Sequence, residues 1–304
     1  KYYAQYFRRT SIGPAPRTSQ VMALTEHLVQ WPTMTAAQRE EAYSPSSCIG
    51  GNYQPFVDAY ATQSAAARAE IGPGQEAAYG PQPAQTLDLF LPTLPPGDLA
   101  PLVVFIHGGY WQELSKSESS FAAPSWVKNN VAFAALDYTL APHATLAEIA
   151  EECCQAIRHL KTHATELNLD PECMVLTGSS AGAHLAAMVA NSVSVKATVL
   201  FSGIYDLVPL VGTSINEALQ LNETQAQELS VQPQPGFPSS VVCWGENETT
   251  EFKAQSQAFA AALQAQGTEC QQYEIAGRNH FDVVFELSDL STPTSQHLIS
   301  LMNV

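Results

Sequence analysis

The stretch Met174-Val175-Leu176-Thr177-Gly178-Ser179-Ser180-Ala181-Gly182 decides the fold of this chain. It begins as a short apolar run, which is typical of a strand buried on both faces. The residues that follow it, 183–190, have the periodicity of a helix. The two glycines around Ser180 complete the pattern G-x-S-x-G, which between a strand and a helix makes a sharp turn that exposes the serine hydroxyl. We therefore predict that Ser180 is a nucleophile at the carboxyl edge of a sheet. The alternatives are Ser179, which occupies the variable position of the motif, and a glycine-rich turn with incidental serines.

Outward from this stretch, strand-like and helical segments alternate. Such alternation predicts a mostly parallel sheet with helices on both faces, and 304 residues suit one such domain. Residues 1–45 are expected to form an irregular extension because three prolines interrupt them, and residues 71–84 are expected to form a loop. The strand-like runs are 86–91 (read as an edge strand), 101–106, 131–136, 174–177, 197–201, 241–244 and 270–275, and the helical segments are 54–70, 145–167, 183–190, 251–266 and one that starts at Thr292-Pro293.

A second motif follows the run 101–106, namely His107-Gly108-Gly109-Tyr110-Trp111. Glycines after this strand let backbone N–H groups face a reacting carbonyl without a side chain in the way. We predict that Gly108, Gly109 and Ala181, the residue after the nucleophile, donate to the oxyanion. The N–H of Tyr110 is an alternative donor, and His107 is expected to brace the loop.

The base and the acid should follow Ser180 in the order serine, acid, histidine. His280 lies in a loop after the last strand-like run and is the expected base, whereas His184 is expected to pack and His297 to lie on the surface. The acid should follow the run 241–244. Spacing there favours Glu248, with Glu246 and Asp282 as alternatives and Glu251 as a partner of a helix N-terminus.

Composition limits the partners. The chain has 13 basic and 29 acidic residues, a formal net charge of −16, which predicts no binding to nucleic acid or to anionic membranes. It contains no apolar run of membrane-spanning length and no signal-like segment at its N-terminus. Six cysteines without metal-type spacing indicate buried reduced thiols in a cytoplasmic protein. We expect no metal and no cofactor, and a homodimer stays open.

The motifs together resemble the kynurenine formamidases, or arylformamidases, of the α/β-hydrolase superfamily. The resemblance runs from about Tyr43 to the C-terminus and rests on the segments 107–112, 178–185, 137–142, 202–207 and 279–282 (HGGYWQ, GSSAGAHL, DYTLAP, SGIYDL and NHFD). It implies an α/β-hydrolase fold and an acid loop of the form Gly-Glu-x-Asp-x-x-x-Phe, which places the acid at Glu248. The family has Asp there, so this chain must absorb an extra methylene by a shifted loop or another rotamer.

The implied activity is hydrolysis of N-formyl-L-kynurenine to kynurenine and formate, a reaction on a small-molecule substrate. Tyr110, Trp111 and Phe281 are the expected walls of the pocket, and residues 1–45 and 205–235 are expected to form a small cap over it. Two other hypotheses stay open at this point. One is a carboxylesterase or amidase of secondary metabolism, and the other is an inactive, ligand-binding homologue.

Overall fold

The computed structural model describes residues 31–302, which build an eight-stranded sheet with helices on both faces. The strands are in the order β1-β2-β4-β3-β5-β6-β7-β8. The pairs β1–β2 and β2–β4 are antiparallel and all other pairs are parallel. The strands are β1 Gln75–Ala78, β2 Thr86–Phe90, β3 Ala100–Ile106, β4 Ala132–Leu136, β5 Leu169–Ser179, β6 Ala197–Phe201, β7 Ser239–Asn247 and β8 Cys270–Asn279.

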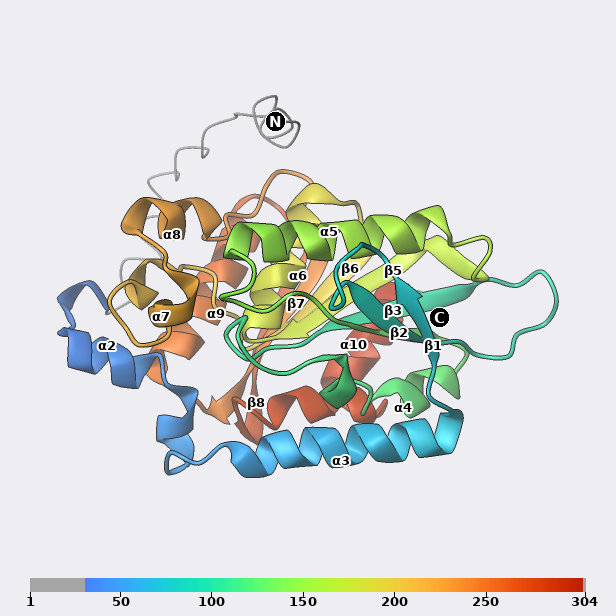
Figure 1. Cartoon of the computed structure of the whole chain (residues 1–304), viewed down its shortest axis with the longest axis horizontal. Coiled ribbons are helices and arrows are strands. Elements are labelled where there is room, and N and C mark those ends of the chain that lie inside the picture. The colour runs from blue at the N-terminus through green and yellow to red at the C-terminus, as the bar shows by residue number, and fades with distance from the viewer. Residues whose placement is uncertain (1–30, 303–304) are drawn as a thin grey trace.

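The helices form two layers and an end group. The layer α5, α6 and α9 packs on one face of the sheet, α3, α4 and α10 pack on the other, and α2, α7 and α8 gather at one end (Figure 1). These helices are α2 Ala36–Ala42, α3 Gln54–Ile71, α4 Ala123–Val127, α5 Leu146–Thr162, α6 Ala181–Ser192, α7 Asn216–Leu219, α8 Glu223–Leu229, α9 Thr250–Ala265 and α10 Pro293–Met302.

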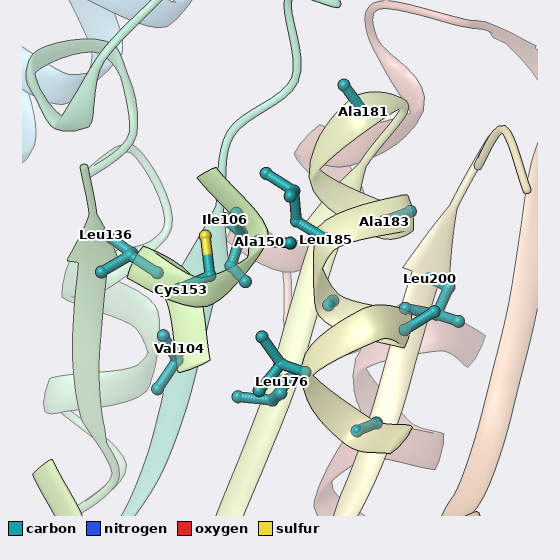
Figure 2. Close-up of a cluster of buried hydrophobic side chains, with 14 of the residues drawn as sticks. Val104, Ile106, Leu136, Ala150, Cys153, Leu176, Ala181, Ala183, Leu185 and Leu200 are labelled. Atoms are coloured by element: carbon teal, nitrogen blue, oxygen red, sulfur yellow. The ribbon is translucent and has the colours of Figure 1, made fainter. Parts of the chain in front are cut away.

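Alternation along the buried strands explains the two layers. In β3, Val104 and Ile106 face the cluster that contains α5 and α6, whereas Val103 and Phe105 face the cluster that contains α3 and α10. Figure 2 shows the first cluster, in which Leu176 and Leu185 pack between the strands and α6. Successive side chains point to opposite faces, so an unbroken apolar run can serve two layers at once. The predicted α/β-hydrolase architecture is confirmed.

Helix starts follow the capping signals. Thr145 accepts a hydrogen bond from the N–H of Glu148 and the Glu148 carboxylate returns to the N–H of Thr145, closing a capping box at α5. Thr292 caps α10 through the N–H of Ser295 at 3.3 Å. Both helices therefore begin where the sequence predicts.

Three predictions about the first hundred residues were wrong. Within the supposedly irregular segment 1–45, Thr35 and Gln38 form a capping box that starts α2; residues 1–30 lie outside the described part of the chain. Strand β1 lies in the expected loop 71–84 and pairs with β2, so β2 is not an edge strand. Short polar elements such as these are stabilised by pairing with neighbours, and their own sequence pattern is weak.

The cap expected from the N-terminal and 205–235 segments is built by α2, α7 and α8. The Arg39 guanidinium donates to the carbonyl of Val211 at 3.2 Å, and the Glu40 carboxylate accepts from the N–H of Ser214 at 2.8 Å. These bonds join α2 to the turn before α7, at the end of the molecule where both lie in Figure 1.

The cysteines depart in part from expectation. All six lie in the described range and are free thiols, but Cys48 is exposed and Cys270 is only partly buried. No helix within residues 31–302 has both the length and the apolar character needed to cross a bilayer.

His184 links α6 to the cap and predicts a pH-dependent stability. Its Nε2 lies 2.9 Å from the carbonyl oxygen of Leu229, and burial lowers its pKa from 6.5 to about 4. Between these two pKa values the unfolded chain binds a proton at His184 and the folded chain does not. The contribution of neutral His184 to the free energy of unfolding is therefore complete above pH 6.5 and is lost as the pH falls towards 4. Between pH 7.5 and pH 5, we expect the wild type to lose about 2 kcal/mol more unfolding free energy than His184→Gln. Urea unfolding at both pH values measures this, and equal losses would contradict it.

Candidate active site

Ser180 occupies a strained turn between β5 and α6. Its backbone has φ 57° and ψ −118°, and its N–H donates to the carbonyl of Phe201 at 2.8 Å. A Cβ on Gly178 would collide with the backbone of Gly182, and one on Gly182 would collide with the carbonyl of Ile106. Positive φ at a non-glycine residue persists only where its surroundings enforce it. Here the close passage of three backbone segments does so and lifts the serine to the sheet edge.

The glycine loop after β3 lies directly against this serine. A Cβ on Gly108 would lie 2.8 Å from the carbonyl oxygen of Ser179 and 3.3 Å from Cβ of Ser180. Within the described part of the chain, the N–H groups of Gly108 and Gly109 have no acceptor, and Ala181 carries the first N–H of α6. First-turn N–H groups have no partner inside their helix. Of the three expected oxyanion donors, Gly108 thus lies against Ser180, and Ala181 follows Ser180 in the chain. Gly109 follows Gly108 and lines the same cavity as Ser180.

The His107 ring lies where a brace would. It stacks on the Tyr138 ring with centroids 4.2 Å apart, and its Nε2 lies 3.5 Å from the Asp137 carboxylate. The Tyr138 hydroxyl also donates to the His107 carbonyl at 3.0 Å. These contacts hold the start of the glycine loop.

His280 and Glu248 are in direct contact. The distance between Nδ1 of His280 and Oε2 of Glu248 is 2.9 Å, and both residues are buried. The other candidate acids are engaged elsewhere. Glu246 accepts from the N–H of Gly277 at 2.7 Å, and Asp282 accepts from the N–H of Asn279 at 2.7 Å.

Glu251 and His297 have other partners. Glu251 is fully buried in the first turn of α9 and accepts from the Tyr43 hydroxyl at 3.3 Å. His297 is half-buried on α10, with its Nδ1 3.5 Å from the Tyr273 hydroxyl.

Ser202 is a site residue that sequence reasoning missed. It follows β6 with φ 48° and is fully buried, and its Oγ donates to Oε1 of Glu248 at 2.5 Å. The N–H of Gly245 donates to the same oxygen at 2.5 Å. With Oε1 held by two donors, Oε2 is directed to His280. The segment 202–207 carries part of the family resemblance, and its local pattern does not predict a contact with residue 248.

Replacing Ser202 with alanine should lower kcat about tenfold and change KM little, because a hydrogen bond to a charged group contributes about 1.5–3 kcal/mol and this one orients the carboxylate that contacts His280. Steady-state kinetics, which measure kcat and KM separately, check this prediction. Ser240→Ala is the matched control, since Ser240 is also buried but bonds Thr198 at 2.8 Å, away from Glu248. A rise in KM alone, or equal losses in both variants, would contradict a positioning role.

A cavity of about 360 Å³ opens beside the serine. Ser180, His280, Tyr110 and Phe281 all line it. Trp111, the third expected wall residue, does not. Left-handed backbone at residues 110 and 111 turns its indole into the core, where it is fully buried 5.1 Å from the His184 ring.

The further cavity lining is mixed. It comes from the cap, from α3, from the end of β3 and from the segment after the glycine loop, and includes Glu40, Tyr53, Val57, Tyr60, Phe105, Glu113, Leu114, Phe121 and Ile215. Within residues 31–302, no three His, Cys, Asp or Glu side chains are grouped as metal ligands.

Comparison with known proteins places this geometry in a family. The family model described as BD-FAE matches residues 87–233. A solved structure from a Silicibacter species, provisionally described as a thioesterase, superimposes with a TM-score of 0.74 at 26% identity, covering 87% of this chain and 98% of that one.

Two curated relatives carry the name kynurenine formamidase. The protein from Salmo salar is 32% identical over an alignment of 240 residues, and the match covers 74% of this chain and 80% of the relative. The protein from Danio rerio is 29% identical over 283 residues, covering 85% of this chain and 94% of the relative. The resemblance seen in the motifs is thereby confirmed along most of the chain. This protein is an α/β-hydrolase and belongs to the kynurenine formamidase family.

Proposed function

We propose that this protein is a serine hydrolase that removes a small acyl group from an aryl amide, with N-formyl-L-kynurenine as the substrate and kynurenine and formate as products. The observation that carries the proposal is the buried contact between Glu248 and His280 beside the cavity that Ser180 lines. A carboxylate on Nδ1 keeps the proton there and leaves Nε2 as the base. The family membership supports the formyl group as the acyl part.

The reaction proceeds in two halves. His280 takes the proton of Ser180 as the hydroxyl attacks the formyl carbon, and the N–H groups of Gly108, Gly109 and Ala181 stabilise the oxyanion. His280 then gives the proton to the departing arylamine as the C–N bond breaks. Water, deprotonated by His280, attacks the formyl-serine ester, and His280 returns that proton to Oγ of Ser180 as the ester bond breaks and formate is released. An aryl amine is a better leaving group than an alkyl amine, so this machinery suffices without a further electrophile.

Purified protein incubated with N-formyl-L-kynurenine tests the proposal. We expect the kynurenine absorbance to appear with one formate released per turnover, and p-nitrophenyl acetate to be hydrolysed as a second substrate. Hydrolysis of the acetate without any release of kynurenine would overturn the assignment and would indicate that the protein is an esterase.

The cavity also supports a carboxylesterase as the second candidate. Its apolar walls, which include Phe105, Leu114 and Phe121, leave room beyond what a formyl group needs. A panel of p-nitrophenyl esters from formate to hexanoate separates the two functions. Activity that rises with acyl length favours the esterase, and a preference for formyl and acetyl groups favours the arylformamidase.

A further inference from the structure

One face of α3 holds the residue that follows His280 in the chain. Tyr53 is the N-cap of α3, and Phe56 and Tyr60 follow it at intervals of three and then four positions, so all three lie on the same side of the helix. Each of them contacts Phe281, the residue after His280. We call these three side chains the α3 clamp.

Two rings of the α3 clamp stack on the Phe281 ring. The Tyr53 ring has its centroid 5.5 Å from that of Phe281 with the planes 8° apart, and the Phe56 ring has its centroid 5.6 Å away with the planes 24° apart. Offset stacking of this kind is a favoured arrangement of aromatic pairs. Phe281 is only half-buried, and within residues 31–302 it belongs to neither of the two core clusters. Helix α3, and not the core, therefore holds this ring in place.

The third member of the α3 clamp holds the backbone of the same residue. The Tyr60 hydroxyl donates to the carbonyl oxygen of Phe281. Tyr60 is buried, and burial raises the pKa of its hydroxyl, so the donated proton stays on Tyr60. The turn that carries His280 is also closed locally, because the side-chain oxygen of Asn279 accepts from the N–H groups of Phe281 and Asp282. The α3 clamp thus anchors from outside a turn that is already closed on itself.

The α3 clamp also reaches the glycine loop. Both carboxylate oxygens of Glu113 lie 3.2 Å from the Tyr53 hydroxyl, and the N–H of Glu113 donates to the carbonyl of Gly109 at 3.0 Å. Helix α3 therefore connects the turn that carries His280 with the loop that lies against Ser180. A shift of either segment relative to α3 would change the position of His280 relative to Ser180.

We propose that the α3 clamp is a positioning element: through Phe281, it holds Nε2 of His280 at the distance from Oγ of Ser180 that proton transfer requires. The proposal deepens the function above and rests on His280 acting as the base. The bond from Glu248 determines which way the imidazole faces, and the clamp determines where the turn that carries the imidazole lies. A displacement of about 1 Å between reacting groups can lower a rate about 10²-fold.

Phe56 allows the cleanest test, because it stacks on Phe281 but is not among the residues that line the cavity. In Phe56→Leu we expect kcat for p-nitrophenyl acetate to fall about fivefold while KM stays within about twofold, as for a small displacement of the base. The rate constant for labelling of Ser180 by a fluorophosphonate should fall by the same factor. Intact-protein mass counts the sites that label, so the loss can be expressed per competent site and not confused with unfolding.

A double-mutant cycle shows whether the effect passes through Phe281. Phe281→Leu should lower kcat, and adding Phe56→Leu to it should lower kcat no further, because the contact is already lost. Tyr60→Phe removes only the hydroxyl and should lower kcat about threefold, again with little change in KM. Tyr273→Phe is the matched control and should behave as the wild type, because its hydroxyl bonds Thr294 at 3.0 Å.

An unchanged kcat in Phe56→Leu, a change in KM alone, or losses that add in the double variant overturn the proposal. So does a wild type that neither hydrolyses the acetate nor labels, because His280 then does not activate Ser180. The two proposals fail separately, since both probes report on His280 whatever the natural substrate is. The predicted losses without any release of kynurenine refute the formamidase function alone. Equal release of kynurenine by the wild type and Phe56→Leu refutes the positioning role alone.

Discussion

Replacing Ser180 with alanine should lower kcat by about 10⁵–10⁶-fold, because a serine hydrolase without its nucleophile keeps only the catalysis that its oxyanion donors and binding site provide. Ser180 lies in the strained turn at the end of β5, next to Gly108, and lines the cavity. The alanine methyl fits the same backbone, so the fold and the cavity should persist. Substrate affinity should therefore survive while the covalent step is lost.

Labelling by a fluorophosphonate, read by intact-protein mass, checks this directly. The wild type should gain one adduct and Ser180→Ala none. Ser194→Ala is the control and should label fully, because Ser194 is exposed beyond the end of α6. An adduct on the Ser180→Ala protein would contradict the assignment, and its disappearance on further replacement of Ser179 would transfer the role to that neighbouring hydroxyl.

Glu248→Gln should lower kcat by about 10⁴-fold, the loss expected when the acid of a triad becomes an amide. The geometry specifies why. The N–H of Gly245 always donates, and it points to the Oε1 position together with the hydroxyl of Ser202. The amide oxygen of glutamine will take that position, so its NH₂ will face Nδ1 of His280. Nδ1 must then accept, the ring proton moves to Nε2, and His280 cannot deprotonate Ser180.

Two variants make this prediction sharp. Glu248→Asp keeps the charge but shortens the reach to His280, so its kcat should lie between those of the wild type and Glu248→Gln. Glu246→Gln changes the exposed carboxylate near the end of β7, whose oxygen accepts from the N–H of Gly277, and should lower kcat less than twofold. A large loss of kcat in Glu246→Gln together with a small loss in Glu248→Gln would show that Glu246, and not Glu248, is the acid.

The features that could be predicted from the sequence are those that neighbouring residues determine. The turn around Ser180 needs small residues next to it in the chain, and the caps at Thr145 and Thr292 bond residues three positions away. Apolar runs long enough to fill two layers identify the central strands. Strand β1 and helix α2 were missed because polar pairing and packing between distant segments stabilise them.

For the site, the sequence by itself determined the kinds of groups and the order in which they occur: a serine on a tight turn, a glycine loop, and a histidine after the last strand. Only the tertiary structure decided which carboxylate contacts His280, because Glu246 and Glu248 differ by two residues but point to different partners. The tertiary structure also places Ser202 in contact with the Glu248 carboxylate and buries Trp111 in the core. Such contacts join residues tens of positions apart, and their geometry depends on how parallel strands align. No local pattern records that alignment.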